Sequence, residues 1–169
     1  MKAYILIGGR SKRMGRSKTE LFLDRLVAAA APVFEEVIAV QRHGGDAVSV
    51  PTIFEDAHDH EGAIFGVARA LRDVQEQAFL LAVDYPYVTA EILRHLRDDA
   101  RVPVWDGWPQ PLCAVWPASA LPRIEAHIAR GAFDLHGVID REMIPESELR
   151  ARFPGEPLRN VNTLEDWHG

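Results

Sequence analysis

The sequence predicts a single α/β domain, residues 1–169, in which a mostly parallel sheet forms the middle of three αβα layers. Short apolar runs alternate with helical patterns up to about residue 100. This alternation is typical of a parallel sheet that helices cover on both faces. A chain of 169 residues allows one core and is short for two domains. Because no proline- or glycine-rich linker divides the chain, we expect one domain.

The strands are expected where short apolar runs are bounded by turn residues. The run 78–83 is the most apolar and predicts the central strand. Beyond residue 100 the pattern changes, and 102–105 and 112–116 suggest strands that lie next to each other after a turn at Asp106 and Gly107. The predicted strands are 3–7, 36–41, 48–54, 78–83, 102–105, 112–116 and 158–161.

The helices are expected where apolar residues recur at helical spacing. Residues 20–34 are alanine-rich, although Pro32 limits the end of that helix. Thr89 is suited to cap the helix that follows it, and Thr163 to cap a last helical turn. The other predicted helices are 63–74, 89–98, 121–130 and 133–139.

A glycine-rich basic loop follows the first strand. Gly8 and Gly9 end the apolar run, and five basic residues follow within 10–18. Glycines let an anion approach backbone N–H groups closely, and lysine and arginine supply charge for phosphates. Neither G-x-x-x-x-G-K-[ST] nor G-x-G-x-x-G is present. The pattern indicates a phosphate-handling loop, with a basic surface loop as the alternative.

Three polar features follow predicted strands, where ligands bind in open α/β sheets. They are the Gly8–Gly9 loop, Asp56 and Asp84. Asp84 comes directly after the most apolar strand, and Pro86 fixes the exit of the chain. Mg²⁺ uses one or two carboxylates together with substrate phosphates. Asp84 therefore either holds Mg²⁺ opposite a triphosphate or caps the following turn.

The first loop resembles a family signature. Residues 6–15 followed by Lys18 are similar to the L-x-G-G-x-S-x-R-M-G-x-x-K pattern of sugar-nucleotidyltransferase-like enzymes, and are most similar to the molybdenum cofactor guanylyltransferases. The resemblance implies a Rossmann-like fold of the nucleotide-diphospho-sugar transferase type. It also implies that the loop wraps the triphosphate of the nucleotide. The binding residues that it implies there are Leu6, Ile7, Gly8, Gly9, Arg13 and Lys18.

Two further segments carry the resemblance through the middle of the chain. Residues 83–88 are similar to the C-D-x-P-[FY] motif, whose aspartate binds Mg²⁺, which implies that role for Asp84. Residues 56–66 resemble D-x(n)-G-P-L-A-G-[IL], which implies that Asp56 and Gly62 help to hold the nucleotide. Ala63 replaces the proline of that motif and Phe65 the small residue.

The C-terminal third matches two more family segments. Residues 160–166 match N-[VI]-N-T-x-E-[DE], so Asn162 either supports the metal or caps the last helix. Residues 108–116 resemble the Q-P-L-x-A-L-[WY] strand that faces the acceptor. Trp105 and Trp108 either line an acceptor pocket or pack in the core. We expect Cys113 to be buried filler, because no basic partner is adjacent.

The histidines offer weaker candidates. The cluster His58, Asp59, His60 and Glu61 has metal-ligand residue types. Alternating residues in a flexible loop rarely converge on a metal without further ligands, so we do not expect a transition-metal site there. His127 and His136 fall in predicted helices and are expected at the surface or its boundary.

The family resemblance implies a reaction and its partners. GMP is transferred from GTP to a molybdopterin-type acceptor with release of pyrophosphate, Arg13 and Lys18 neutralise phosphates, and Asp84 holds Mg²⁺. A cytidylyltransferase, another NTP transferase or a non-catalytic nucleotide-binding paralogue are the alternatives. Two departures from the family pattern bear on nucleotide affinity and specificity. Ser17 stands where the family has aspartate, and the G-K-P-L segment after the loop lysine is missing.

Composition excludes several other classes. A net charge of −6 argues against general nucleic-acid binding, and a single cysteine excludes an intrachain disulfide. The longest apolar stretch, 26–34, is far shorter than a membrane span and contains Pro32. No signal peptide is visible. We expect a cytoplasmic protein without membrane or nucleic-acid partners, and with transient contacts to other cofactor-biosynthesis proteins.

Overall fold

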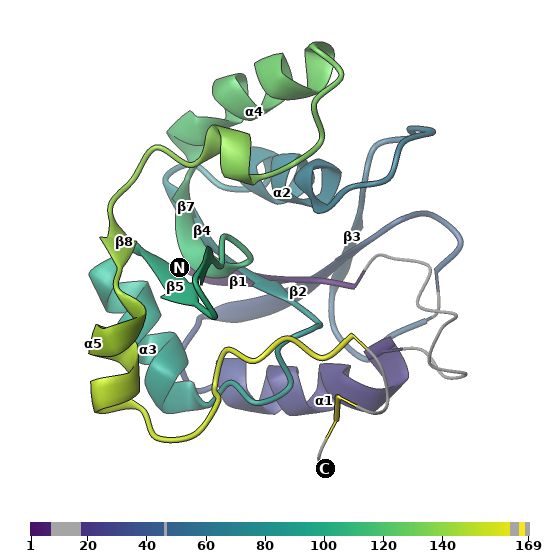
Figure 1. The fold of residues 1–169 in the computed structure, drawn as a ribbon. Coiled ribbons are helices and arrows are strands. Elements are labelled where there is room, and N and C mark those ends of the chain that lie inside the picture. Colours follow the sequence, from purple (N-terminus) through teal and green to yellow (C-terminus); the bar gives the residue numbers. More distant parts are fainter. Residues whose placement is uncertain (8–17, 46, 163–165, 168–169) are drawn as a thin grey trace.

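The computed structural model of the chain describes residues 1–7, 18–45, 47–162 and 166–167. Strands and helices alternate as far as α3, except that β3 follows β2 without a helix between them, and short strands and helices follow (Figure 1). Two 3₁₀ turns, 118–120 and 136–138, join the later elements. The elements are β1 (Lys2–Leu6), α1 (Lys18–Ala30), β2 (Glu36–Gln41), β3 (Thr52–Phe54), α2 (Ala63–Arg72), β4 (Gln77–Ala82), α3 (Ala90–Asp99), β5 (Val102–Trp105), β6 (Trp108–Pro109), β7 (Cys113–Pro117), α4 (Leu121–Ala129), β8 (Met143–Ile144) and α5 (Glu146–Arg152).

The main sheet has five strands in the order β3-β2-β1-β4-β7. β1 pairs in parallel with both β2 and β4, and β2 pairs in parallel with β3. β7 is antiparallel to β4 at one edge. The expected α/β class with a mostly parallel sheet is confirmed.

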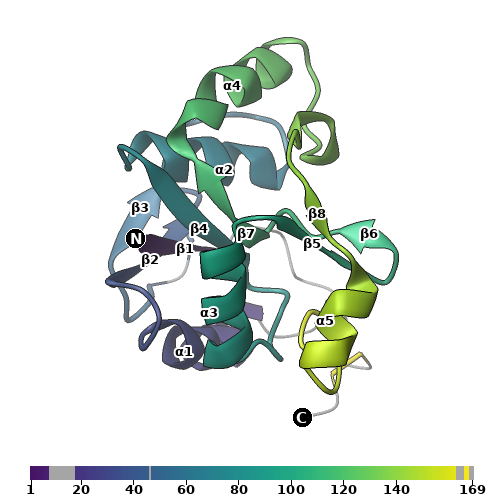
Figure 2. The same ribbon diagram turned by 90° about the vertical axis from the view of Figure 1, so that its left-hand side faces the viewer.

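Helices cover both faces of this sheet and make it the middle of three layers. β1 shows the division, because Ala3 and Ile5 belong to one buried cluster, and Tyr4 and Leu6 to the other. α1 and α3 lie against the first face, and α2 and α4 against the second, as Figures 1 and 2 show from two directions. Since neighbouring residues of a strand point to opposite faces, an apolar run with no polar alternation is required here.

A small second sheet corrects the expected pairing of the later strands. β5 pairs with β6 and β8, in the order β6-β5-β8. β7, which we expected beside 102–105, pairs instead with β4 of the main sheet. The turn at Asp106 and Gly107 leads back into the two-residue strand β6, so the hairpin closes before the chain reaches β7.

Several predicted boundaries also differ. α1 begins at Lys18 and ends at Ala30, before Pro32, rather than spanning 20–34. β3 covers only Thr52–Phe54 of the predicted 48–54, because Pro51 has no N–H for the ladder. The predicted helix 133–139 is reduced to the 3₁₀ turn 136–138, and 158–161 forms no strand.

The predicted helix 89–98 is confirmed in its cap and its buried face. The Thr89 hydroxyl accepts from the Ile92 N–H, and the apolar stripe of the helix is buried. His127, expected at the surface or its boundary, is buried at 9% exposure. Its Nε2 lies 3.1 Å from a carboxylate oxygen of Asp134, which supplies the polar partner that a buried imidazole needs. Among the described residues no helix is long and apolar enough to cross a membrane.

Candidate active site at the β1–β4 switch point

The carboxyl ends of β1 and β4 lie side by side at the point where the strand order reverses. From β1 the chain passes to β2 and β3 on one side, and then returns to β4 on the other. The Val83 N–H donates to the Leu6 carbonyl over 3.2 Å, and the Ile7 N–H donates to the Val40 carbonyl over 2.9 Å. Ligands of open α/β sheets bind in the crevice at such a reversal. Leu6, Ile7 and Asp84 therefore lie where the sheet predicts a binding site.

Three of the residues singled out in the sequence converge there. The Lys18 Nζ lies 2.7 Å from Asp84 Oδ1 and donates to Asn162 Oδ1 over 3.3 Å. The Lys18 side chain is 9% exposed and that of Asp84 is 30% exposed. An ammonium, a carboxylate and an amide oxygen thus lie together at the carboxyl ends of the strands, although their residues are far apart in the sequence.

Local structure fixes each of the three. Lys18 is the first residue of α1, so the helix fixes its backbone. The helix is itself held against the core by its buried residues Phe22 and Leu26. Asp84 follows β4, and its backbone carbonyl accepts from the Val161 N–H over 2.9 Å. This bond brings the C-terminal segment across the end of β4 and places Asn162 beside the lysine.

The oxygens of this cluster fit a hard cation. Mg²⁺ prefers carboxylate and other oxygen ligands and keeps places for phosphates and water. Asp84 offers a partly exposed carboxylate, and Asn162 offers an amide oxygen. The Lys18 ammonium contacts Oδ1 of Asp84, so a metal ion bound to that carboxylate would lie close to a second positive charge. The phosphates of a bound nucleotide would offer the lysine a second anionic partner.

Three residues assigned to phosphate binding, Gly8, Gly9 and Arg13, lie outside the described residues, as does Ser17, which departs from the family pattern. So does Thr163, the expected cap of the last helical turn. Lys18 is the described residue of that loop signature that enters the cluster with Asp84.

Asp56 and Gly62 lie in the loop between β3 and α2. The Asp56 carboxylate is 71% exposed and forms an ion pair with Arg72, which also binds Glu125 of α4. Asp56 is not in the cluster of Lys18, Asp84 and Asn162. Gly62 precedes α2 with a φ of +151°, and a Cβ there would come within 3.1 Å of the Phe133 carbonyl oxygen. Glycine is therefore required where this loop enters the helix.

A buried carboxylate beside that loop was missed from the sequence. Glu55 is 7% exposed and accepts from His58 Nε2 over 2.9 Å. The Arg42 guanidinium donates to the carbonyls of His58 and His60 and to His58 Nδ1. Since a guanidinium only donates, Nδ1 is the acceptor, and the His58 proton points at Glu55. An acid directly after a strand is the same signal that identified Asp84.

The histidine-rich loop is therefore held by protein contacts, and His58, Asp59, His60 and Glu61 form no group with metal-ligand geometry in the described part of the chain. His58 is bonded on both ring nitrogens, and the rings of His60 and Phe133 stack with centroids 4.4 Å apart. One group with metal-ligand geometry is found among the described residues, formed by His95, Asp99 and Glu148. Arg101 already binds both carboxylates of that group, so it forms an ion-pair network.

Trp105 and Trp108, the two tryptophan candidates for an acceptor pocket, differ clearly in burial. Trp105 is 1% exposed and packs in the core, whereas Trp108 is 69% exposed. Cys113 is fully buried, and burial raises the pKa of its thiol far above the ordinary value, which fits the expected filler role. Gln110 and Tyr85 form a hydrogen bond of 2.8 Å that sequence reasoning did not anticipate.

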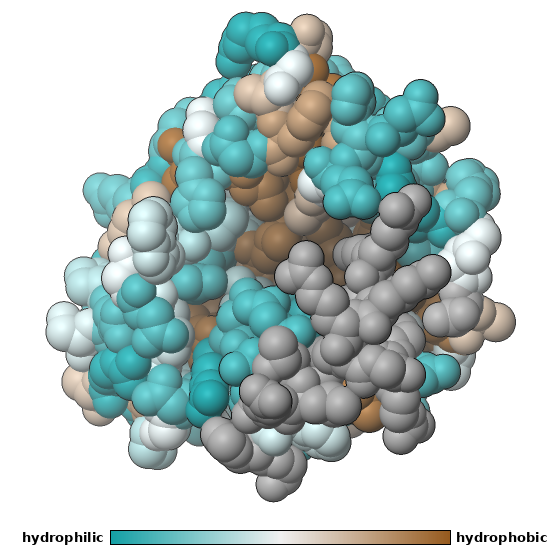
Figure 3. Space-filling model, turned by 45° about the vertical axis from the view of Figure 1, so that its right-hand side comes forward, coloured by the Kyte–Doolittle hydropathy of each residue, from teal (hydrophilic) through white to brown (hydrophobic). Residues whose placement is uncertain are grey.

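The face at the carboxyl ends of the strands is hollowed. Figure 3 looks onto it and shows an apolar floor surrounded by hydrophilic side chains. A separate cavity of about 400 Å³ lies beside the start of α3, lined by Tyr87, Thr89 and Glu91 and, across from them, by 153–154, 156–157 and 159. That cavity contains none of the predicted site residues, so it is distinct from the cluster around Asp84.

Comparison with known proteins gives the same family over most of the chain. The model of the MobA-like NTP transferase domain matches residues 3–144. A probable molybdenum cofactor guanylyltransferase from Carboxydothermus hydrogenoformans is 29% identical, with 96% of this chain and 91% of that protein covered. One from Mycobacterium avium is 31% identical, with 96% and 90% covered.

Solved structures agree in fold. Molybdopterin-guanine dinucleotide biosynthesis protein A from Archaeoglobus fulgidus superposes with a TM-score of 0.81 at 27% identity, covering 98% of this chain and 94% of that one. A 2-C-methyl-D-erythritol 4-phosphate cytidylyltransferase from Thermus thermophilus has a TM-score of 0.65 at 16% identity, covering 98% and 94%. The chain has the nucleotide-diphospho-sugar transferase fold and belongs to the MobA-like NTP transferase domain family.

Proposed function

We propose that this nucleotidyltransferase-family protein transfers GMP from GTP to a molybdopterin-type acceptor and releases pyrophosphate, with Mg²⁺ as its cofactor. The observation that carries the proposal is the 2.7 Å contact between Lys18 Nζ and Asp84 Oδ1 at the switch point of the sheet. Lys18, a cation suited to phosphates, and Asp84, a carboxylate suited to a metal ion, lie in direct contact there. The choice of GTP as nucleotide and of a molybdopterin-type acceptor is supported by the relatives that are named molybdenum cofactor guanylyltransferases.

In this reaction a phosphate oxygen of the acceptor attacks the α-phosphorus of GTP. The bond from that phosphorus to the bridging oxygen of the β-phosphate breaks, and the electron pair leaves with pyrophosphate. The chemistry requires little covalent help from a protein, so positioning and charge neutralisation dominate. A bound Mg²⁺ supplies Lewis-acid stabilisation of the charge on the phosphates.

The residues of this chain would divide the work. Asp84 would hold the metal, with the Asn162 amide oxygen in support. Lys18 and Arg13 would neutralise the triphosphate, and the Gly8–Gly9 backbone would approach it closely. Leu6 and Ile7, at the end of β1, would lie under the nucleotide, with Asp56 and Gly62 on its β3 side.

The proposal places this chemistry in one domain of residues 1–169 in the cytoplasm, where GTP is available. Because a molybdopterin-type acceptor must reach the site from the proteins that make it, transient contacts with other cofactor-biosynthesis proteins belong to the proposal. It includes neither a nucleic-acid nor a membrane partner.

Pyrophosphate release tests the proposal. The purified protein is incubated with Mg²⁺ and a molybdopterin-type acceptor, and GTP, CTP, UTP and ATP are compared. Release that depends on the acceptor and is fastest with GTP is the expected result. Preference for CTP would establish the cytidylyltransferase alternative. Nucleotide binding without pyrophosphate release would establish a non-catalytic paralogue.

A further inference from the structure

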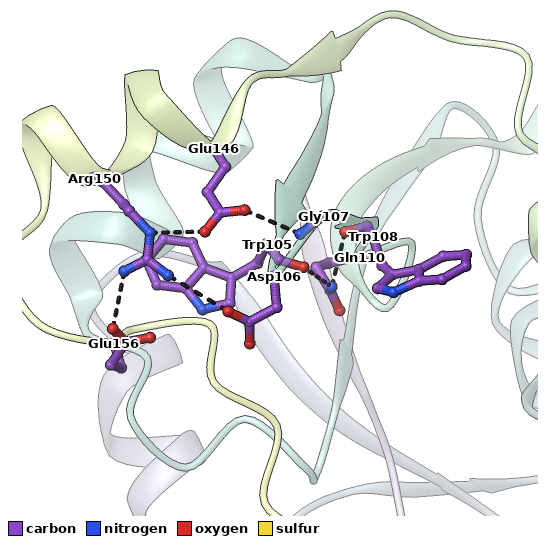
Figure 4. Close-up of polar contacts among 8 residues, drawn as sticks. All are labelled: Trp105, Asp106, Gly107, Trp108, Gln110, Glu146, Arg150 and Glu156. Carbon is purple, nitrogen blue, oxygen red and sulfur yellow. Dashed lines mark hydrogen bonds and ion pairs between the residues drawn. The ribbon is translucent and has the colours of Figure 1, made fainter.

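Trp108 leaves most of its indole exposed to solvent. It is 69% exposed, and the other exposed large apolar side chain among the described residues is Phe54 at 40%. A single exposed apolar residue needs no explanation by itself. Trp108 differs from such a residue because the hairpin that carries it is held by contacts from α5 and from Gln110 (Figure 4).

The turn of that hairpin requires an unusual backbone. Asp106 and Gly107 have φ values of +50° and +75°, and they join β5 to β6 as a two-residue turn. Glu146 of α5 accepts the Gly107 N–H over 3.0 Å. Arg150 lies 4.1 Å from the centroid of the Trp105 ring, and Trp105 is the register partner of Trp108. The turn end of the hairpin is thus fixed against α5.

Gln110 connects the hairpin to the candidate active site. Its Nε2 donates to the carbonyls of Trp105 and Trp108, both over 2.9 Å. Its Oε1 accepts from the hydroxyl of Tyr85 over 2.8 Å, and Tyr85 is the residue after Asp84. The backbone that carries Trp108 is therefore positioned by the same loop that carries the proposed metal ligand.

We propose that the exposed face of Trp108 stacks on the planar heterocycle of the acceptor and helps to determine acceptor specificity. This inference rests on the function proposed above. In the sheet order β3-β2-β1-β4-β7, the nucleotide candidates Leu6 and Asp56 lie on the β1–β3 side of Asp84. The hairpin leads into β7, on the opposite side. In phosphoryl transfer the attacking and leaving oxygens lie roughly in line, so the acceptor approaches from the side away from the pyrophosphate.

The indole is also suited to a flat heterocycle. Its ring face is electron-rich, and aromatic systems prefer offset stacking on such a face. The nearby ring of His136 meets it edge-on, at 76° and 6.4 Å between centroids. By comparison with bases that stack on aromatic side chains, removal of the indole is expected to weaken binding about tenfold.

The test combines binding with kinetics. Calorimetric titration uses 6-hydroxymethylpterin monophosphate as the probe, and steady-state GMP transfer uses a molybdopterin-type acceptor. Wild type is compared with Trp108→Ala, with Trp108→Phe as the conservative variant, and with Phe54→Ala as the exposed-aromatic control. We expect Trp108→Ala to weaken pterin binding and raise the acceptor KM about tenfold, with kcat and GTP affinity unchanged. Trp108→Phe should retain most of the affinity, and Phe54→Ala should behave as wild type.

Three outcomes would overturn the inference. These are wild type that does not bind the pterin, Trp108→Ala with unchanged pterin affinity and acceptor KM, and Trp108→Ala with weakened GTP binding instead. The last would identify a platform for the nucleotide base. Failure of the proposed function is distinguishable, because it appears as wild type that transfers no GMP from GTP.

Discussion

Lys18 and Asp84 form an ion pair of 2.7 Å although 66 positions separate them in the chain. The ammonium contacts Oδ1 of the carboxylate that we propose as the metal ligand. A metal ion bound to Asp84 and the Lys18 ammonium would repel each other. The phosphates of a nucleotide would attract both of these positive charges. Metal and triphosphate binding are therefore expected to be coupled through this pair.

Lys18→Met should separate these two roles. Removal of the ammonium leaves the Asp84 carboxylate without its competing cation, so Mn²⁺ binding in the absence of nucleotide should tighten about tenfold. GTP should bind more weakly, while guanosine affinity should change little, because the lysine is assigned to phosphates. Calorimetric titrations measure all three ligands. Lys2→Met, at the other end of β1, is the control. Equal losses for GTP and guanosine would indicate structural damage instead.

Asp84→Asn should nearly abolish pyrophosphate release while the fold persists. A neutral amide is a poor ligand for a hard cation, and we expect a loss of about a hundredfold or more. Melting temperature checks the fold, and Asp98→Asn, an exposed aspartate paired with Arg97 on α3, is the matched control. Activity close to wild type at saturating Mg²⁺ would remove Asp84 from the mechanism.

The shortened segment after Lys18 should affect nucleotide selection. α1 starts at Lys18 and runs unbroken to Ala30, where the family pattern has a short strand and a G-K-P-L segment. Without that wall less of the base is buried, and tight discrimination needs polar groups that the wrong base leaves unpaired. Titration with GTP and ATP, each with Mg²⁺, should show weak binding and a preference below about tenfold. Submicromolar GTP binding with strong rejection of ATP would mean that another element replaces the wall.

The hydrogen bond between Tyr85 and Gln110 should be visible in stability. Burial raises the pKa of the Tyr85 phenol far above its ordinary value, so the hydroxyl stays a donor across the usable pH range. Gln110→Ala leaves that buried hydroxyl unpaired, which should cost about 1–3 kcal/mol of unfolding free energy. In urea unfolding, Tyr85→Phe combined with Gln110→Ala should lose less than the sum of the two single variants. Strict additivity would contradict the direct contact.

His95 should contribute to acid sensitivity. Burial, assisted by the positive charges of Arg152 and Arg101, lowers the pKa of His95, while Asp99 and Glu148 partly oppose the shift. The unfolded chain therefore binds the proton at a higher pH than the folded protein. Stability from this group is complete above about pH 6.5 and is lost as the pH falls toward the folded-state pKa. His95→Gln should flatten the decline in melting temperature between pH 7 and pH 5. An unchanged decline would exclude this role.

The central architecture was predictable because it depends on local signals. Each parallel strand, buried on both faces, needs an apolar run, and Asp84 stands out because it follows such a run. Asn162 was identified by its resemblance to a family motif. The direct contact of Lys18 with both was not predicted, because Lys18 was assigned to the phosphates of the nucleotide. The strand order β3-β2-β1-β4-β7 could not be predicted from local patterns, because it depends on pairing between distant segments.

The parts that were missed or wrong depend on contacts rather than on patterns. α5 buries Leu149 within a highly charged sequence, and β6 and β8 have two residues each, too few to show a period. The surroundings of Asp56 are set by Arg72, which a separate helix supplies. Residues 158–161 are apolar at their ends, but the Val161 N–H bonds to Asp84 alone rather than to a strand ladder.

The contact between Lys18 and Asn162 spans 144 positions, and the backbone bond from Val161 to Asp84 accompanies it. During synthesis on a ribosome, β1, α1 and β4 emerge long before residue 162. A nascent chain that has reached β7 contains the lysine and the aspartate but not the segment that closes over them. Closure of so long a loop is also entropically costly and comes late in folding. The three-residue cluster is thus completed only after residue 162 has left the exit tunnel, so shorter nascent chains do not present the finished cluster.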